Sequence, residues 1–162
     1  MTEDLSAAGP AAEVLRSAGI AFTVHLCSPD EGVAIADCAR ELHIDEHAIA
    51  KTLLLEADGD PFLVLMHGDM RASAKDLAET MGAKSVTPCP PDKAHEYTGY
   101  HPGRISPLGV RRQMRIFTEE TLLNLRKIYV NGGRRGYLLG IDPEDLAALL
   151  HPVLVRVGSS RA

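Results

Sequence analysis

Thr98-Gly-Tyr-His-Pro-Gly-Arg-Ile-Ser-Pro-Leu-Gly109 is the most informative stretch of this chain. Pro102 and Pro107 have no backbone N–H, so they exclude a helix interior and disfavour a central strand. The three glycines of the stretch allow its backbone to approach another group closely. The pattern predicts a long, shaped loop, the kind of segment on which binding and catalytic residues concentrate.

Helices and strands are expected on both sides of this loop. Apolar periodicity, capping residues and turn signals predict helices over residues 10–19, 28–42, 73–81, 90–97 and 142–150. The same reasoning predicts strands over residues 20–26, 50–56, 62–67, 115–118, 127–131, 137–141 and 153–157. Because the two element types interleave without strict alternation, we expect a mixed α/β fold with helices packed on a mixed sheet. Residues 1–8 and 159–162 are expected to be frayed.

Length and composition favour one domain over residues 1–162, with its core at about 12–157. No stretch approaches the roughly 20 apolar residues of a membrane span. The acidic start, Met1-Thr-Glu-Asp4, is unlike a secretory signal. Cysteines are odd in number and lack CxxC spacing (Cys27, Cys38, Cys89). We therefore expect unpaired thiols in a reducing cytoplasm, without a disulfide framework or a cysteine-rich zinc site.

Positive charge is concentrated in one region, although the net charge of the chain is −5. Residues 104–135 hold eight basic and two acidic side chains. Such an excess suits an anionic partner such as the phosphates of a nucleic acid. The alternative is a solvated basic face without a partner.

Two further segments are candidates for a site. Lys51 is the sole charge opening an apolar strand, where its ammonium group either reaches solvent or points into a cleft. In a cleft it could hold a phosphate or polarise a carbonyl oxygen. Asn131-Gly-Gly-Arg-Arg-Gly136 is either a hairpin turn with a basic tip or, paired with the 98–109 loop, the opposite wall of a cleft. It lacks the spacing of a dinucleotide-binding or Walker motif.

The sequence predicts neither a metal site nor a protein nucleophile. His43 and His47 have i, i+4 spacing, but no glutamate follows His43 and no third ligand is evident. Nothing marks Cys27 or Cys38 as an activated thiol, and the chain has no Gly-x-Ser-x-Gly elbow. Catalysis, if present, is therefore expected to rest on positioning and electrostatics.

Taken together, Lys51-Thr-Leu-Leu54, the 98–109 loop and Gly132-Gly-Arg-Arg-Gly136 resemble the YbaK/EbsC-type aminoacyl-tRNA deacylases. These are relatives of the editing domain of bacterial prolyl-tRNA synthetase, and the resemblance extends over roughly residues 12–157. It implies a mixed sheet curled toward a partial barrel with surrounding helices. It also implies a trans-acting enzyme that hydrolyses mischarged tRNA without a cofactor. The implied partners are the aminoacylated 3′ end of tRNA and a prolyl-tRNA synthetase, with no membrane and no DNA.

The resemblance also implies roles for individual residues. The expected catalytic residues are Lys51, Gly103 and Asn131, with the lysine near the 3′-terminal adenosine. The expected substrate-binding residues are Thr98, Gly99, Tyr100, Ile105, Ser106, Gly132 and Gly133. The expected tRNA-binding residues are Arg104, Arg111, Arg112, Arg134 and Arg135. In the cysteine-specific branch the substrate's own thiol is thought to attack the ester, which agrees with the lack of a protein nucleophile.

Three departures from the family pattern leave the amino acid open. Arg104 stands where many members have a second glycine, and Asn131 stands where a serine is common in the cysteine-specific branch. Residues 30–33 lack an expected aromatic side chain. Cys-tRNA(Pro) is the first candidate substrate, with Ala-, Ser- or another mischarged tRNA as alternatives. A non-catalytic module that binds tRNA or a nucleotide, and a small-molecule hydrolase, are the alternative functions.

Overall fold

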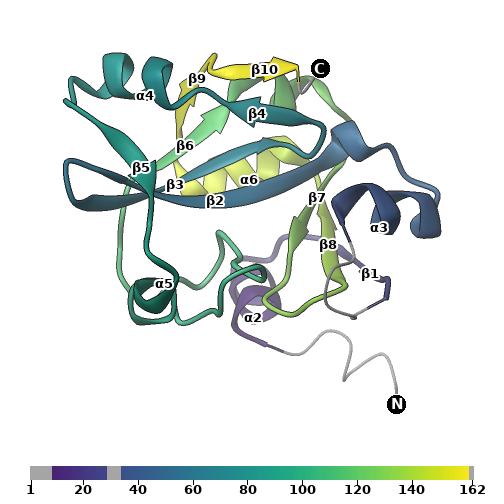
Figure 1. The fold of residues 1–162 in the computed structure, drawn as a ribbon. Coiled ribbons are helices and arrows are strands. Elements are labelled where there is room, and N and C mark those ends of the chain that lie inside the picture. Colours follow the sequence, from purple (N-terminus) through teal and green to yellow (C-terminus); the bar gives the residue numbers. More distant parts are fainter. Residues whose placement is uncertain (1–8, 29–33, 161–162) are drawn as a thin grey trace.

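A computed structural model describes residues 9–28 and 34–160 of the chain (Figure 1). The strands are β1 (Thr23–Leu26), β2 (Ile49–Ala57), β3 (Asp60–His67), β4 (Met70–Ala72), β5 (Val86–Pro88), β6 (Ile116–Glu119), β7 (Ile128–Asn131), β8 (Tyr137–Ile141), β9 (Val153–Val155) and β10 (Gly158–Ser160). The helices are α2 (Pro10–Ser17), α3 (Ile35–Leu42), α4 (Ala74–Met81), α5 (Pro91–Thr98) and α6 (Pro143–Leu150), with 3-10 turns η1 (Glu46–Ala48) and η2 (Glu120–Asn124).

The main sheet is mixed, as the sequence predicts. Its strand order is β1-β8-β7-β2-β3-β6-β9, and β5 also pairs with β2. The β1–β8, β7–β8, β2–β3 and β2–β5 pairs are antiparallel, whereas the β2–β7, β3–β6 and β6–β9 pairs are parallel. Among the described residues β1 and β9 remain the two ends of this order, so the sheet does not close into a barrel. The expected mixed α/β class is confirmed.

The β2–β3 hairpin forms where the Asp-Gly signal predicts it. Asp58 and Gly59 both have positive φ, at 49° and 90°, the conformation of a type I′ turn that matches the twist of the flanking strands. Ala57 pairs with Asp60 directly across this turn. Strand β3 is buried along almost its whole length, so the hairpin is the centre of the sheet.

Side-chain caps set the start of two helices as expected. Ser73 accepts a hydrogen bond from the Asp76 N–H at the start of α4, and Asp142 accepts one from the Glu144 N–H at the start of α6. The predicted start of α3 at residues 28–33 lies largely outside the described residues. The described α-helices are eight residues each, and none could cross a membrane.

The C-terminal segment differs from its prediction. Ser159 and Ser160 were expected to be frayed, but they belong to β10, which pairs with β4. A buried carboxylate anchors this segment, because Glu119 accepts hydrogen bonds from the Val157 and Gly158 N–H groups at 2.7 and 2.8 Å. Strands of three residues carry too little periodicity to be read from sequence, which is why the prediction missed β4, β5 and β10. The remaining residues expected to be frayed, 1–8 and 161–162, lie outside the described part.

Apolar cores on both faces of the sheet hold the strands in place. One cluster includes Leu65 and Leu139 with residues of α2 and α6. The other includes Phe62 and Val64 with residues of α4. In Figure 1, α3 lies beside the ends of β1, β7 and β8, away from α4 and β10. The candidate site lies on this side of the sheet.

Candidate functional site

Buried side chains brace the loop between α5 and β6, here called the glycine-rich loop (residues 98–109). The Thr98 hydroxyl donates to a carbonyl of α5 at 2.7 Å and accepts from the Tyr100 N–H at 3.0 Å. The Tyr100 hydroxyl donates to the Leu108 carbonyl at 2.5 Å, and the Ser106 hydroxyl accepts from the Leu108 N–H at 3.2 Å. Burial raises the pKa of Tyr100 to about 12, so its hydroxyl keeps the proton that it donates. The loop is therefore shaped by its own hydrogen bonds.

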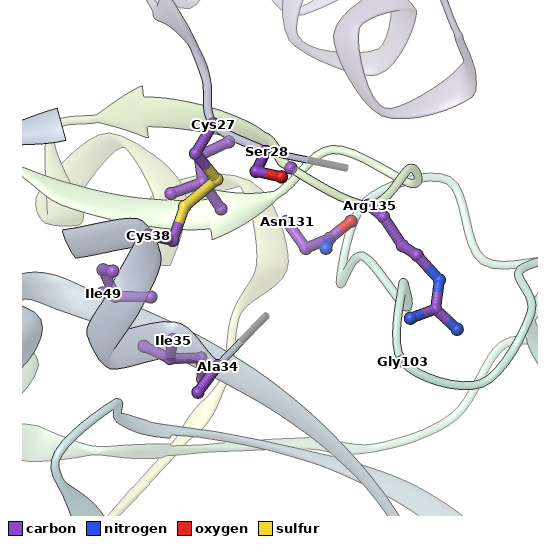
Figure 2. A pocket seen from close by; sticks show the side chains of 11 residues that line it. Cys27, Ser28, Ala34, Ile35, Cys38, Ile49, Gly103, Asn131 and Arg135 are labelled. Carbon is purple, nitrogen blue, oxygen red and sulfur yellow. A yellow bond between two sulfur atoms is a disulfide. The ribbon is translucent and has the colours of Figure 1, made fainter. Parts of the chain in front are cut away.

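The β7–β8 turn, residues 131–136, packs directly on this loop. The Asn131 side-chain oxygen accepts a hydrogen bond from the Gly133 N–H at 2.6 Å. A Cβ on Gly133 would lie 2.6 Å from a ring carbon of Tyr100, and the Gly133 φ is 106°. The Arg135 guanidinium lies 3.9 Å from the place of a Cβ on Gly103. The two segments therefore lie side by side and form one wall, instead of facing each other across a cleft (Figure 2).

Lys51 lies where one edge of β2 changes partner. This edge pairs with β7 at residues 49–50 and with β5 at residues 55–57. No strand in the described part of the chain pairs with residues 51–53 between them. The Leu54 carbonyl accepts from the Cys89 N–H on this edge, and backbone groups two residues apart point the same way. The Thr52 amide and carbonyl therefore face the opening in the sheet.

Two adjoining pockets open at this break in the sheet. The small pocket has a volume of about 120 Å³ and the large pocket one of about 260 Å³. Both are lined by Ile35, Ile49, Gly103, Asn131 and Leu138. The large pocket is also lined by Lys51, Thr52, Leu53 and Ile105. The structure thus brings the three expected catalytic residues, Lys51, Gly103 and Asn131, to one pocket, together with Ile105.

A disulfide between Cys27 and Cys38 corrects the expectation of unpaired thiols for these two residues. Cys27 directly follows β1 and Cys38 lies on α3, with their Cα atoms 5.6 Å apart. Their pairing follows from tertiary packing of the helix on the end of the strand, which a spacing of 11 residues does not encode. Cys89, on the other side of the sheet break, is free. Both bonded cysteines line the small pocket, where they face the Asn131 and Arg135 wall (Figure 2).

Three of the expected tRNA-binding arginines meet in a groove beside the small pocket. Arg104, Arg134 and Arg135 line this groove, whose volume is about 670 Å³. The Arg134 guanidinium lies over the ring of Tyr137, 4.3 Å from its centroid, which limits the directions it can take. The groove and the small pocket share Arg135, so positive charge reaches the rim of the pocket.

The other two arginines lie at the far end of the glycine-rich loop. Arg112 lies over the ring of Tyr97 of α5, 5.0 Å from its centroid. Arg111 packs beside Gly99, whose added Cβ would lie 3.7 Å from the Arg111 Cβ. Both arginines are exposed. The five predicted arginines thus form two groups.

Several of the expected substrate-binding residues support the walls of the site. The side chains of Thr98, Tyr100 and Ser106 are buried and hydrogen bond to nearby backbone. Gly132 makes room for Tyr137, because an added Cβ would lie 2.5 Å from that ring. Sequence reasoning missed the apolar lining residues Ile35, Ile49 and Leu138. Their apolar character is also that of ordinary core residues, so no local signal distinguishes them.

A histidine cluster lies next to the start of β2. The rings of His47 and His67 are stacked with centroids 3.7 Å apart, and His47 is 2.8 Å from the Asp69 carboxylate. The buried His67 bonds through one ring nitrogen to the His47 carbonyl and through the other to the Thr121 hydroxyl, each at 2.7 Å. Burial lowers the pKa of His67. The lone pair of an imidazole nitrogen lies in the plane of its ring, so two stacked parallel rings cannot both coordinate one ion. The cluster therefore fits a structural link between η1, β3 and η2 better than a metal site.

Comparison with known sequences bears on this site. Residues 30–149 match the model of a family described as the aminoacyl-tRNA editing domain. A proline–tRNA ligase of Streptococcus equi subsp. zooepidemicus is 31% identical over 110 residues, which cover 67% of this chain and 18% of the ligase. The ligase of Nitratidesulfovibrio vulgaris is 27% identical over 111 residues, covering 68% of this chain and 18% of the ligase. The chain thus corresponds to less than a fifth of the length of these relatives.

Solved structures share the fold over most of the chain. A crystal structure of a hypothetical protein superposes with a TM-score of 0.84 at 25% identity, covering 93% of this chain and all of the other. A protein described as a candidate trans-editing enzyme for prolyl tRNA synthetase superposes with a TM-score of 0.81 at 20% identity, covering 91% of this chain and 94% of the other. At 20% identity, the second superposition shows that the two proteins share a fold.

Proposed function

The chain belongs to the aminoacyl-tRNA editing domain family, and we propose that it acts in trans to hydrolyse mischarged tRNA(Pro). Cys-tRNA(Pro) is the first substrate to test, followed by Ala- and Ser-tRNA(Pro). The observation that carries this proposal is the convergence of Lys51, Gly103 and Asn131 on one pocket. These residues come from β2, the glycine-rich loop and the end of β7, so the fold gathers them from distant parts of the sequence.

The pocket suits a reaction driven by positioning. An aminoacyl ester is already reactive, so a fixed orientation and stabilisation of the developing oxyanion supply the catalysis. The half-buried Lys51 supplies a positive charge, and the backbone turn at Gly103, closed by a hydrogen bond from the Arg104 N–H to the His101 carbonyl at 3.1 Å, positions the bound ester. The cysteines that line the small pocket, Cys27 and Cys38, are joined to each other and offer no thiol nucleophile. Water, or a nucleophile carried by the substrate, is then the attacking group.

The arginine groove is proposed to bind the 3′ end of the tRNA. Arg104, Arg134 and Arg135 lie beside the pocket, where the phosphates of a single-stranded CCA end would pass. Arg111 and Arg112 form a second group, proposed to contact the acceptor stem. A prolyl-tRNA synthetase is the proposed protein partner, since the sequence relatives are ligases of that kind.

Single-turnover deacylation tests the assignment. Cys-, Ala- and Ser-tRNA(Pro), with Pro-tRNA(Pro) as reference, are incubated with wild type, Lys51→Ala and Lys93→Ala. Lys93 is an exposed lysine of α5 and serves as the charge-matched control. We expect one mischarged species to be hydrolysed and Lys51→Ala to slow that step by about 100-fold or more. If every ester survives while the tRNA still binds, the chain is a binding module and the catalytic proposal is wrong.

A further inference from the structure

We propose that the Cys27–Cys38 disulfide sets the amino-acid specificity of the site in a redox-dependent way, by fixing the width of the small pocket. This inference rests on the proposed function and adds to it, because it assigns the aminoacyl side chain to that pocket. The large pocket, which contains Lys51 and has about 260 Å³ against about 120 Å³, takes the terminal adenosine. The ester then lies at the boundary that both pockets share, beside Gly103 and Asn131.

The lining of the small pocket suits a small, uncharged side chain. Ile35, Ile49 and Leu138 supply apolar surface, and the disulfide adds a further apolar patch. Polar groups also line the pocket: Asn131 and Arg135 stand beside the glycine-rich loop, and Ser28 directly follows Cys27 (Figure 2). Alanyl and prolyl side chains carry no polar group that could bond to Ser28, Asn131 or Arg135, so the pocket discriminates between these two chiefly by size.

The two walls of the pocket differ in how firmly they are held. The wall formed by the glycine-rich loop and the β7–β8 turn is fixed by hydrogen bonds and by close packing of Gly133 on Tyr100. The other wall is α3, which packs on the sheet through Cys38 and Ala39. Beyond that packing, the disulfide and a hydrogen bond from the Ser28 N–H to the exposed Glu41 tie α3 to the segment after β1. The width of the pocket therefore depends on the disulfide.

Reduction would release this tie. A dithiol reductant attacks one sulfur as a thiolate, the S–S bond breaks, and the mixed disulfide resolves into the oxidised reductant. Two electrons and two protons end on the Cys27 and Cys38 thiols. Two unbonded sulfurs sit at van der Waals distance, so they move apart by about 1.5 Å. Because Ile35 shares α3 with Cys38, the lining of the pocket moves with it, and larger side chains gain entry.

Deacylation rates in the two redox states test the inference. The oxidised protein, the protein reduced with dithiothreitol, Cys27→Ser/Cys38→Ser and the control Cys89→Ser are compared on Ala- and Pro-tRNA(Pro). Thiol titration in denaturant defines the states, with one thiol expected in the oxidised protein and three after reduction. We expect the ratio of kcat/KM for alanyl over prolyl substrate to fall about tenfold on reduction, as a change of roughly one methylene in pocket size does. The double variant should match the reduced protein in either medium.

Binding separates this inference from the proposed function. Amide-linked alanyl- and prolyl-adenosine cannot be hydrolysed, and their affinities for both redox states report pocket width without chemistry. A redox-dependent affinity ratio with no deacylation supports the inference about the pocket and overturns the catalytic function. The same ratio in both states, or three titratable thiols in protein never exposed to reductant, overturns the inference itself.

Discussion

The two walls of the small pocket are held in place by different kinds of interaction. The glycine-rich loop is held by many short-range contacts, since Thr98, Tyr100 and Ser106 each bond to backbone within eight residues. The α3 wall depends on one covalent link between residues 11 apart, supported by the Ser28–Glu41 hydrogen bond and by apolar packing. The first arrangement fixes the position of the loop, whereas the second can be loosened when a reductant breaks the disulfide. In the function proposed above, a site built in this way would combine a fixed reaction centre with a side-chain pocket of adjustable width.

The wall formed by the glycine-rich loop and the β7–β8 turn, here called the tight wall, should lose stability when a methyl group is added to it. Gly133→Ala places a Cβ 2.6 Å from the Tyr100 ring at a φ of 106°. Backbone strain and overpacking together predict a loss of about 4 kcal/mol in the free energy of unfolding, measured by urea denaturation. This is the largest effect that we expect.

Gly59→Ala is the matched control for that variant. Gly59 has a φ of 90° and nothing within 4 Å of an added Cβ. The Gly59→Ala variant therefore has backbone strain without overpacking and should lose about 1–2 kcal/mol in the free energy of unfolding. Equal losses in the two variants would show that the packing of Gly133 on Tyr100 contributes nothing.

The α3 wall should lose stability through its cross-link. In the chain-entropy model a loop of this size gives about 3 kcal/mol, so Cys27→Ser/Cys38→Ser should be that much less stable than the oxidised protein. Reduced wild type should match the double variant, and Cys89→Ser should be unaffected by reductant. A double variant as stable as the oxidised protein would show that apolar packing alone fixes α3.

The same contrast explains what the sequence could reveal. The glycine-rich loop was recognisable because proline and glycine constrain the backbone locally, and its motif belongs to the family. The β2–β3 hairpin was predictable for a similar reason, from Asp58 and Gly59. The disulfide was not, because the contact between Cys27 and Cys38 arises from packing of distant elements. The break in the sheet beside Lys51 also escaped prediction, since strand partners are not written in the strand itself.

Removing one hydroxyl should weaken the tight wall moderately. Tyr100→Phe leaves the buried Leu108 carbonyl without the donor that now lies at 2.5 Å. An unsatisfied buried carbonyl predicts a loss of about 2 kcal/mol in unfolding free energy and slower deacylation as the loop loosens. Tyr97→Phe is the control, because it removes a hydroxyl from α5 without affecting Leu108. A stable Tyr100→Phe variant would mean that other bonds suffice to shape the loop.

The smallest expected effect is a loss of stability at acid pH, and it acts on the side of the pocket that α3 forms. His67 clasps η1, which leads into Ile49 of the pocket lining. Burial holds its pKa below the unfolded value of about 6.5. The neutral ring therefore contributes stability that is fully present above about pH 6.5 and is lost as the pH falls through the folded pKa.

Thermal unfolding at about pH 7.5 and about pH 5.5 measures this loss, on either side of the usual histidine pKa. Wild type should lose more Tm on acidification than His67→Gln, which has no proton to gain. His101→Gln, on the exposed part of the glycine-rich loop, should behave like wild type. If His67→Gln is as acid-sensitive as wild type, the titration lies elsewhere and His67 is only a packing residue. If the acid sensitivity disappears in His67→Gln, then acid and reductant both loosen the α3 wall, acid through His67 and reductant through the disulfide. The tight wall responds to neither.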